Sequence, residues 1–455
     1  MKKLSTLIVM LTATVVLPLS AQSLRSAYFM DGSFQRSMLN PALQPDKGYV
    51  AFPLLSGLTF DVNSNLGLAN FLYPTSDGRL TTFMNGSVSA SEFLGGLSDA
   101  NALSQGLDWQ LFGLGFKMLG GYSTLSINLH EEAMANVPYD VFRFMKEGFQ
   151  NSSYNINNLS VGAQAYASVE VGHSMNILDV LSVGARVKFL MGIANANFNL
   201  ENINLSMTED RWMVNAQSQM QLALLGGVTV DEKTNPDGGT DYSLALDGYM
   251  PKSYGAAIDL GAAFNFDGIV DGFTVSAGIT NLGFIGWKNM MSVSPISGSF
   301  SYDGMGEIDY GNMESVSDEV EQMGDDLSGL LSFGDADYAK KTMAVAPTIA
   351  LGAEYAMPFY DKLTAGLLFS SHVSKIKSYN DLRLYANLSP VGFFQMSANV
   401  GVSNYGTEFG WYLNLHPKGF ALYLGSDFFS YTLSPQFIPV KRACASVSMG
   451  INIPF

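Results

Sequence analysis

The feature that most constrains the fold is an alternation of apolar and polar residues that recurs along most of the chain. Between positions 159 and 172 the odd positions are Leu, Val or Ala, and the even positions are Ser, Gly, Gln, Tyr or Glu. Successive side chains of a strand point to opposite faces, so this pattern predicts a strand with one apolar face. Similar runs lie at 181–194, 255–266, 272–283, 348–356, 362–370, 381–388, 393–402, 408–416, 420–427 and 444–455, with weaker ones at 49–62, 107–118, 121–130 and 211–224. The sequence therefore predicts an all-β chain of about 14 strands, a number found in membrane barrels.

Charged residues inside the alternating runs fall on the polar phase. They are Glu170, Arg186, Lys188, Asp259, Glu354, Arg383 and Asp427. A lipid-facing Lys or Arg at the centre of a barrel costs roughly 2–4 kcal/mol, which explains why the apolar phase lacks them. The remaining polar positions are mostly Gly, Ser, Thr, Asn, Gln and Tyr, which suit a confined lumen better than the surface of a soluble sandwich. We therefore predict an antiparallel transmembrane β-barrel over 48–455, with these seven residues as lumen candidates for ligand binding.

Composition excludes several classes of protein. The chain of 455 residues has 24 Lys and Arg against 40 Asp and Glu, a net charge of −16. Such a chain lacks the basic footprint of nucleic-acid binding, so no nucleic-acid partner is expected. The sequence also lacks the repeated apolar runs of about 18 residues that a bundle of membrane helices needs. The single cysteine, Cys444, excludes an intramolecular disulfide, and the four histidines are scattered, so no metal and no cofactor are predicted.

The first residues predict export. Lys2 and Lys3 precede an apolar run over 7–19, and Ser20-Ala21-Gln22 follows it. A charged start, an apolar centre and small residues at the exit are typical of a secretory signal peptide. We expect a signal peptide over 1–21 that is cleaved after Ala21.

The last run favours an outer-membrane destination. Apolar residues alternate from Val447 to Ile453, and the chain ends on Phe455. A terminal aromatic residue on an amphipathic last strand resembles the signal that the barrel assembly machinery of the outer membrane reads. We expect the protein in the outer membrane of a Gram-negative bacterium, with outer-membrane lipid and this machinery as partners.

Residues 22–47 interrupt the alternation. They contain Asn40-Pro41-Ala42 and Gln44-Pro45-Asp46 among several apolar residues. Proline restricts Asn40 to extended geometry and favours a turn. We predict that this segment folds into the barrel as a plug or hatch; a periplasmic tail is the alternative.

Three further segments predict short helices. A capping-box spacing of Ser89 and Glu92 predicts one within 86–106, and apolar residues three and four apart predict another over 133–148. Residues 313–332 predict an acidic amphipathic helix in a long loop. That helix is either a lid or partner surface, or it packs on the rim of its own barrel.

Motifs of catalysis are missing from the sequence. It holds no G-x-S-x-G, H-E-x-x-H or phosphate-binding-loop pattern. His173 and Ser174 are neighbours in a predicted strand, so they point to opposite faces. We predict that the protein is not an enzyme. A barrel enzyme would need a Ser or Asp within hydrogen-bond reach of a His in the lumen.

Several short motifs resemble known barrels. The start of the mature chain resembles an uncharacterised family of Gram-negative outer-membrane β-barrels that carries a domain-of-unknown-function label, in the segments Ser26-Ala27-Tyr28-Phe29-Met30, Leu39-Asn40-Pro41-Ala42 and Gly48-Tyr49-Val50. More distantly, Asn40-Pro41-Ala42 and Ile279-Thr280-Asn281-Leu282-Gly283 resemble motifs of long-chain fatty-acid transporter (FadL-like) barrels and of the type IX secretion shuttle (PorV-like) barrel. The resemblance implies 14 strands and an N-terminal hatch, with Asn40 and Pro41 in the hatch motif.

The leading prediction for function is passage of a small hydrophobic or amphipathic molecule across the outer membrane. Arg186 and Lys188 would meet a carboxylate or another anionic head group. Alternatively these cations pair internally with the lumen acids Glu170, Asp259, Glu354 or Asp427 and hold the barrel shut. The second hypothesis is a non-enzymatic platform or shuttle for a protein partner or a secretion system, with 313–332 and 231–241 as candidate surfaces.

Overall fold

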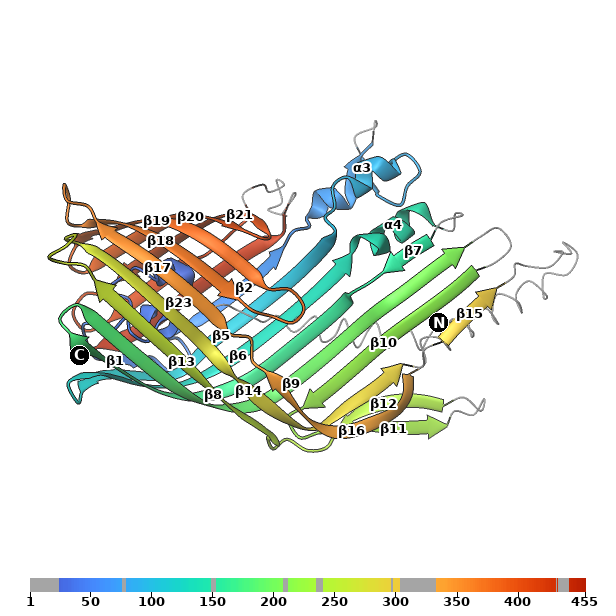
Figure 1. Ribbon diagram of the computed structural model, residues 1–455, viewed down its shortest axis with the longest axis horizontal. Coiled ribbons are helices and arrows are strands. Elements are labelled where there is room, and N and C mark those ends of the chain that lie inside the picture. Colours follow the sequence, from blue (N-terminus) through green and yellow to red (C-terminus); the bar gives the residue numbers. More distant parts are fainter. Residues whose placement is uncertain are drawn as a thin grey trace, which may run out of the picture.

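A computed structural model describes most of the chain (Figure 1). The described residues are 24–75, 79–148, 153–207, 212–234, 240–295, 298–302, 333–430, 432 and 442–455. The predicted signal peptide and the predicted helix at 313–332 lie outside them. No helix among the described residues is long and apolar enough to cross a membrane.

Nineteen strands of the described part of the chain form one antiparallel sheet that closes on itself, because the last strand pairs with both its predecessor and the first two strands. The other four strands form two separate hairpins, β3 with β4 and β11 with β12. The strands are β1 (Tyr49–Ala51), β2 (Leu58–Ser64), β3 (Leu72–Pro74), β4 (Leu80–Thr82), β5 (Ala100–Met118), β6 (Gly121–Pro138), β7 (Ser153–Ile156), β8 (Leu159–Leu178), β9 (Leu181–Met207), β10 (Trp212–Leu224), β11 (Val228–Thr234), β12 (Thr240–Leu246), β13 (Ser253–Asn265), β14 (Phe273–Pro295), β15 (Gly298–Tyr302), β16 (Phe333–Ala344), β17 (Thr348–Ala356), β18 (Leu363–His372), β19 (Tyr379–Val391), β20 (Phe394–Ser403), β21 (Gly406–Leu415), β22 (Ala421–Ser426) and β23 (Cys444–Pro454).

The closed sheet has fourteen strand positions around the barrel. Five pairs of strands each share one position. In each pair the two strands lie one after the other along the barrel wall and pair with the same neighbouring strand. These pairs are β1 with β2, β7 with β8, β10 with β13, β14 with β15, and β16 with β17. The predicted antiparallel barrel of about 14 strands is therefore confirmed.

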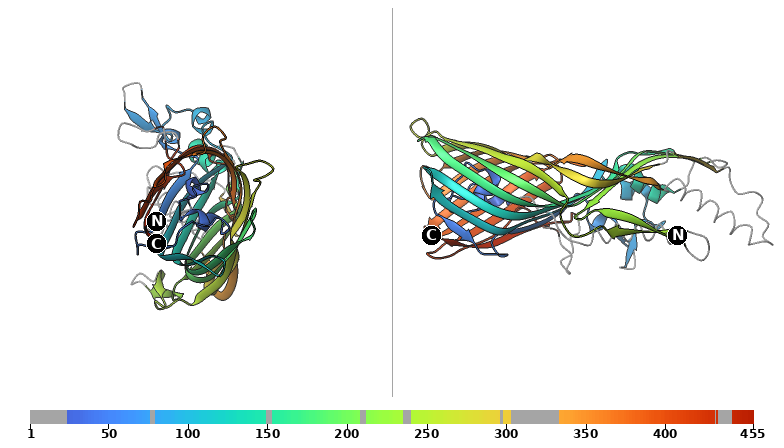
Figure 2. Two further views of the ribbon diagram at one scale, coloured as in Figure 1. Left: turned by 90° about the vertical axis from the view of Figure 1, so that its left-hand side faces the viewer. Right: turned by 90° about the horizontal axis from the view of Figure 1, so that it is seen from below.

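The two ends of the barrel differ. Short turns join the strands at one end, such as Leu119-Gly120 between β5 and β6, and Phe455 lies at that end with its N–H bonded to the carbonyl of Gly48. Long loops and helices lie at the other end (Figure 1). In barrels of this type short turns face the periplasm and long loops face outward. β5, β6, β8, β9 and β14 have 18 to 27 residues, against the about 10 that cross a bilayer, so part of the wall continues well beyond the membrane (Figure 2).

The two faces of the wall follow the alternation. Val171 and Val187 are each 60% exposed on the outer face, whereas Glu170 and Arg186, one residue earlier in each strand, are buried inside. Of the seven predicted lumen residues, six are buried, and Glu354 is half-buried. A shift of register by one residue would put these charges into lipid, so the alternation fixes the register.

The helices match the predictions only in part. α3 (Ala90–Leu94) lies within the predicted range, and Oγ of Ser89 accepts a hydrogen bond from the N–H of Glu92. The helix predicted over 133–148 is wrong for its first part. β6 continues to Pro138, and only α4 (Tyr139–Glu147) is helical. Met134 pairs with β5 and β8 and is buried there, and this cross-strand packing outweighs the local helical spacing. The other helices are η1 (Arg25–Ala27), α2 (Arg36–Leu39) and η2 (Leu68–Asn70).

A charge on the outer face should destabilise the barrel. Leu384 lies in the middle of β19 and is 56% exposed on that face. We expect Leu384→Arg to lower the free energy of unfolding in lipid by about 2–4 kcal/mol, because the guanidinium would enter hydrocarbon. Urea titration in vesicles measures the loss. The control, Leu119→Arg at an exposed short turn, should change stability little; equal losses from both variants would contradict the assigned membrane face.

Candidate functional site

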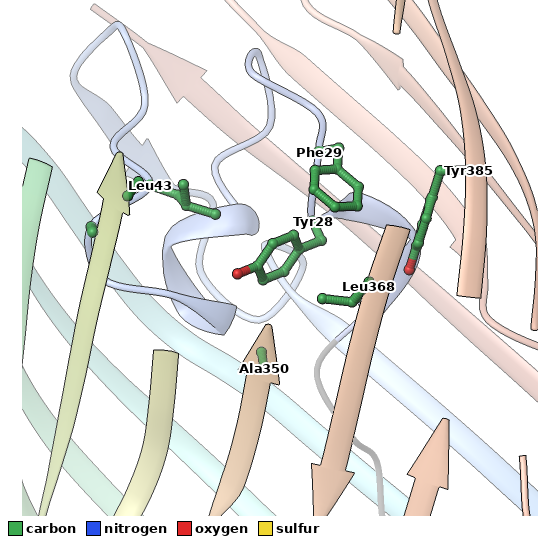
Figure 3. Packing of buried hydrophobic residues seen from close by; sticks show 8 residues of the cluster. Tyr28, Phe29, Leu43, Ala350, Leu368 and Tyr385 are labelled. Atoms are coloured by element: carbon green, nitrogen blue, oxygen red, sulfur yellow. The ribbon is translucent and has the colours of Figure 1, made fainter. Parts of the chain in front are cut away.

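The segment before the first strand lies inside the barrel. Figure 2 shows it, in dark blue, within the ring of strands, and we call residues 24–47 the plug. Tyr28 and Phe29 of the plug are buried against Leu368 and Tyr385 of the wall (Figure 3). The hydroxyls of Tyr28 and Ser276 lie 3.0 Å apart. The plug therefore packs on the wall as a core element would.

A row of glycines seats the plug. Gly184, Gly261 and Gly278 lie opposite one another on the adjacent strands β9, β13 and β14. An added Cβ at Gly184 would collide with the carbonyl of Pro41, and one at Gly261 would collide with Oδ1 of Asn40. Only residues without a side chain let the plug backbone approach the wall this closely. The predicted hatch motif thus lies directly on this glycine row.

Asn40 also ties the plug to itself and to the wall. Its Oδ1 accepts the N–H of Ala42 at 3.0 Å, closing the turn that the following proline predicts. Its Nδ2 donates to the hydroxyl of Tyr28 and to the carbonyl of Ala277, both at 3.2 Å. A shorter or apolar side chain would leave that wall carbonyl without this donor.

Four of the predicted lumen residues form one cluster, the β8–β13 charge cluster of Glu170, Arg186, Lys188 and Asp259. Arg186 Nη1 and Lys188 Nζ lie 3.2 and 3.0 Å from Oδ2 of Asp259, and both cations lie within 3.7 Å of Glu170. All four side chains are at most 4% exposed. Two cations and two carboxylates balance, so the cluster is neutral. Nη2 of Arg186 also donates to the carbonyl of Ser37, which anchors the plug.

His130 extends this cluster with the spacings of a catalytic triad. Its Nδ1 lies 2.5 Å from Asp108, and its Nε2 lies 3.0 Å from Oγ of Ser168. However, Ser168 is fully buried, and its hydroxyl donates to Glu170 at 2.7 Å. A nucleophile must reach its substrate, and this hydroxyl does not line the cavity described below. The side-chain distances that a barrel enzyme would need are therefore present, but the serine hydroxyl is not accessible from the cavity.

A second cluster joins the plug to the far side of the wall. We call it the latch cluster, and its members are Arg25, Asp381, Arg383, Glu408, Asp427 and Arg442. Arg383 bonds Asp381 at 2.9 Å and Glu408 at 2.8 Å, and Arg442 bonds Glu408 at 2.7 Å. Two of the predicted residues, Arg383 and Asp427, belong to it. The seventh, Glu354, joins neither cluster and accepts a hydrogen bond from Thr364.

Asp427 is the wall residue that holds the plug most closely. Its Oδ2 accepts the N–H and the Nε–H of Arg25 at 2.8 and 3.2 Å. Its Oδ1 accepts the N–H and the hydroxyl of Ser26, both at 2.7 Å. Hydrogen bonds to an ionised carboxylate are about twice as strong as neutral ones, so these four contacts dominate the attachment.

A cavity of about 90 Å³ lies between the plug and the long-loop end. Arg25, Tyr28 and Leu39 of the plug line it. The segment before β17 and strands β17 and β18 contribute four apolar residues, which we call the apolar flank, beside the polar Thr348, Ser370 and His372; strands β2, β5 and β6 contribute the polar and acidic flank. The apolar residues are Val345, Ala346, Ala350 and Leu368, and the polar and acidic ones include Asp61, Asp108, His130 and Glu132. A cavity of about 150 Å³ holds benzene, so this one is too small for such a solute while the plug is in place.

A loop reaches across the lumen on the outer side. The side chain of Ile376, between β18 and β19, fills the place that a Cβ at Gly162 of β8 would take. Nε2 of His372 and Oε1 of Glu132, from strands on opposite sides of the barrel, lie 2.9 Å apart. Half-burial lowers the pKa of the Lys377 ammonium in this loop. The cavity is lined by the plug and by His372 and Tyr379, the strand residues at the two ends of this loop.

An apolar layer borders the cavity next to a weak point in the wall. Leu190, Ile285, Trp287 and Val345 are buried together there. β16 ends at Ala344 and β17 starts at Thr348, and between them the pairing with β14 keeps one hydrogen bond, from Val345 to Gly283. Pro347 has no N–H to add another. The cavity therefore reaches an interruption in the pairing of the described wall.

Sequence reasoning missed several members of these clusters. Asp381 and Glu408 lie on the polar phase of predicted strands, so counting every charge in those runs would have found them. His130 was one of only four histidines. Arg25 gave no signal, because it lies in a segment without periodicity and meets its partners only through the closed fold. Among the described residues no group of three or more His, Cys, Asp or Glu side chains is placed to hold a metal ion.

The sequence profile of a family of unknown function, DUF5723, matches residues 41–427. The chain belongs to DUF5723. No curated protein matches it significantly. The match includes Asn40's neighbours Pro41 and Ala42, both charge clusters apart from Arg25 and Arg442, and most of the wall.

Several solved structures match most of the chain at low sequence identity and with TM-scores below 0.5. The Ralstonia pickettii toluene transporter TbuX and the Pseudomonas putida toluene transporter TodX are each 7% identical, with TM-scores of 0.42, over 96% of this chain and 99% and 98% of theirs. The translocator domain of the autotransporter NalP from Neisseria meningitidis is 8% identical, with a TM-score of 0.32, over 90% of both chains.

The glycine row should be essential for seating the plug. We expect Gly261→Val to raise amide hydrogen exchange over 24–47, because the new side chain takes the place of Asn40, while the barrel keeps its heat-modifiable migration on a denaturing gel. Gly392→Val is the control, since nothing lies within 4 Å of an added Cβ there. Unchanged exchange in Gly261→Val would show that the row does not position the plug.

Proposed function

We propose that the protein passes a small amphipathic molecule across the outer membrane and that the plug gates this passage. The observation that carries the proposal is the cavity, which touches the plug and has an apolar flank and an acidic polar one. A molecule with a tail and a polar head would be complementary to both flanks. Movement of the plug would supply the volume that the closed cavity lacks.

The weak point in the wall supports a route for the tail. Val345 and Ala346 line the cavity and belong to the interruption between β16 and β17. Backbone in hydrocarbon is stable only when it is paired, so a place where the pairing is interrupted opens at a lower cost than a continuous ladder. The apolar layer beside it would line the path of the tail toward lipid.

The plug is suited to a gate because it is held by side-chain contacts and not by strand pairing. Its anchors are the hydrogen bonds of Asp427, the bond from Arg186 to Ser37 and the seat of Asn40 on glycines. None of the wall strands depends on the plug for its pairing. Release of the plug would therefore open the lumen while the strand pairing of the barrel stays complete.

The platform hypothesis stays a prediction. One of its candidate surfaces, 313–332, lies outside the described residues, and much of 231–241 belongs to the hairpin of β11 and β12. Mass spectrometry of what copurifies in detergent separates the two hypotheses. A stoichiometric small amphipath supports passage, and a stoichiometric protein without enriched lipid supports the platform.

Removal of the plug should open the lumen. We expect the variant lacking 24–47 to conduct ions in planar bilayers, whereas the intact protein stays closed, because the plug fills the short-turn half of the lumen. Heat-modifiable migration checks that the shortened barrel has folded. A folded variant that does not conduct would mean that the wall side chains seal the lumen, and it would overturn the gated passage.

A further inference from the structure

One side chain of the plug occupies a cation site in the wall. Arg25 is 4% exposed, and its Nε lies 3.2 Å from Asp427 and 3.9 Å from Asp381. Its guanidinium carbon lies 4.5 Å from the centre of the Tyr379 ring and 5.9 Å from that of Phe428. Carboxylates combined with aromatic faces are the usual surroundings of a bound guanidinium or ammonium.

The latch cluster needs this cation for its charge to balance. It contains three carboxylates, Asp381, Glu408 and Asp427, and three guanidinium groups. Two of these, Arg383 and Arg442, belong to the wall and its loop, and the third is Arg25 of the plug. When the plug leaves, one buried carboxylate loses its partner, which is strongly unfavourable. Release of the plug is therefore easiest when another cation takes its place.

A solute in the cavity can reach the Arg25 side of this site. Arg25 and Tyr379 line the cavity, whereas Asp381 and Asp427 do not and would meet the solute only when Arg25 leaves. Among the described lining residues Arg25 is the sole Arg or Lys. Two of the lining carboxylates, Asp108 and Glu132, pair with His130 and His372, which also line the cavity. Arg186 and Lys188, which the sequence offers for an anionic head group, do not line it and are paired within their own cluster. The carboxylates that favour a positive head group are therefore the ones that Arg25 itself pairs with.

We infer that the molecule passed by this barrel carries a guanidinium or alkylammonium head. This head replaces Arg25 at Asp427, Asp381 and Tyr379 and so releases the plug from the wall. The inference rests on the proposed function and adds the class of substrate. The head exchanges one cation for another, so the latch cluster stays neutral throughout. The tail would lie along Leu39, Val345 and Leu368 on the apolar flank.

The vacated site should be filled by free guanidinium. We expect Arg25→Ala to raise amide exchange over 24–44 by about 100-fold, the size expected for a buried carboxylate without its partner. Millimolar guanidinium chloride should restore most of the protection, and sodium chloride at equal ionic strength should not. Arg25→Lys is the matched control, because it keeps a cation beside the carboxylates of the latch cluster. The inference would be overturned if guanidinium did not restore the protection lost in Arg25→Ala. It would also be overturned if Arg25→Ala did not raise amide exchange at all.

The intact protein gives a second test that does not depend on the variant folding. Octylguanidinium, octanoate and octanol share one tail and differ in head charge. We expect octylguanidinium to speed exchange of 24–44 at least about tenfold more than the other two. Equal effects of all three would overturn the cationic head and leave the gated passage standing. No effect of any of them, together with a plug-deleted barrel that does not conduct, would overturn both.

Discussion

The structure depends on the rule that a backbone in hydrocarbon must pair all its polar groups. A sheet meets this rule only by closing, and closure gives every strand one face toward lipid and one toward a narrow interior. The outer face must then be apolar where it meets lipid, and charged side chains of that part of the wall face the interior. The interior is too narrow for such charges to remain hydrated, so they occur as neutral clusters that span neighbouring strands.

These clusters give the plug its attachment points. The β8–β13 charge cluster is complete within the wall and offers the plug one spare donor, on Arg186. The latch cluster is incomplete without Arg25. The two anchors therefore differ in kind: the first is a hydrogen bond that water can replace, and the second is a charge that only another charge can replace. That difference makes the latch cluster the place where a ligand would control the gate.

The sequence predicted the barrel because alternation is local, and each strand reports its own two faces. Strand positions, the phase of Glu170, Arg186 and Lys188, and the cap at Ser89 all follow from neighbours within a few residues. The ends of strands could not be predicted from near neighbours, because the extension of β6 through Met134 depends on pairing with β5 and β8. The latch cluster was also out of reach, since it gathers side chains from the plug and from the last five strand positions.

The distance along the chain between Arg25 and Asp427 has a consequence for assembly. The two residues are 402 positions apart, and the carboxylate follows β22, the penultimate strand. The N-terminal segment emerges first but finds its partner only when nearly all of the wall has been added. The contact between Arg25 and Asp427 can therefore form only when the sheet is nearly complete. A barrel stalled before its last strands would keep an unlocked and water-filled interior, distinguishable from the finished protein by proteases that cut the free segment.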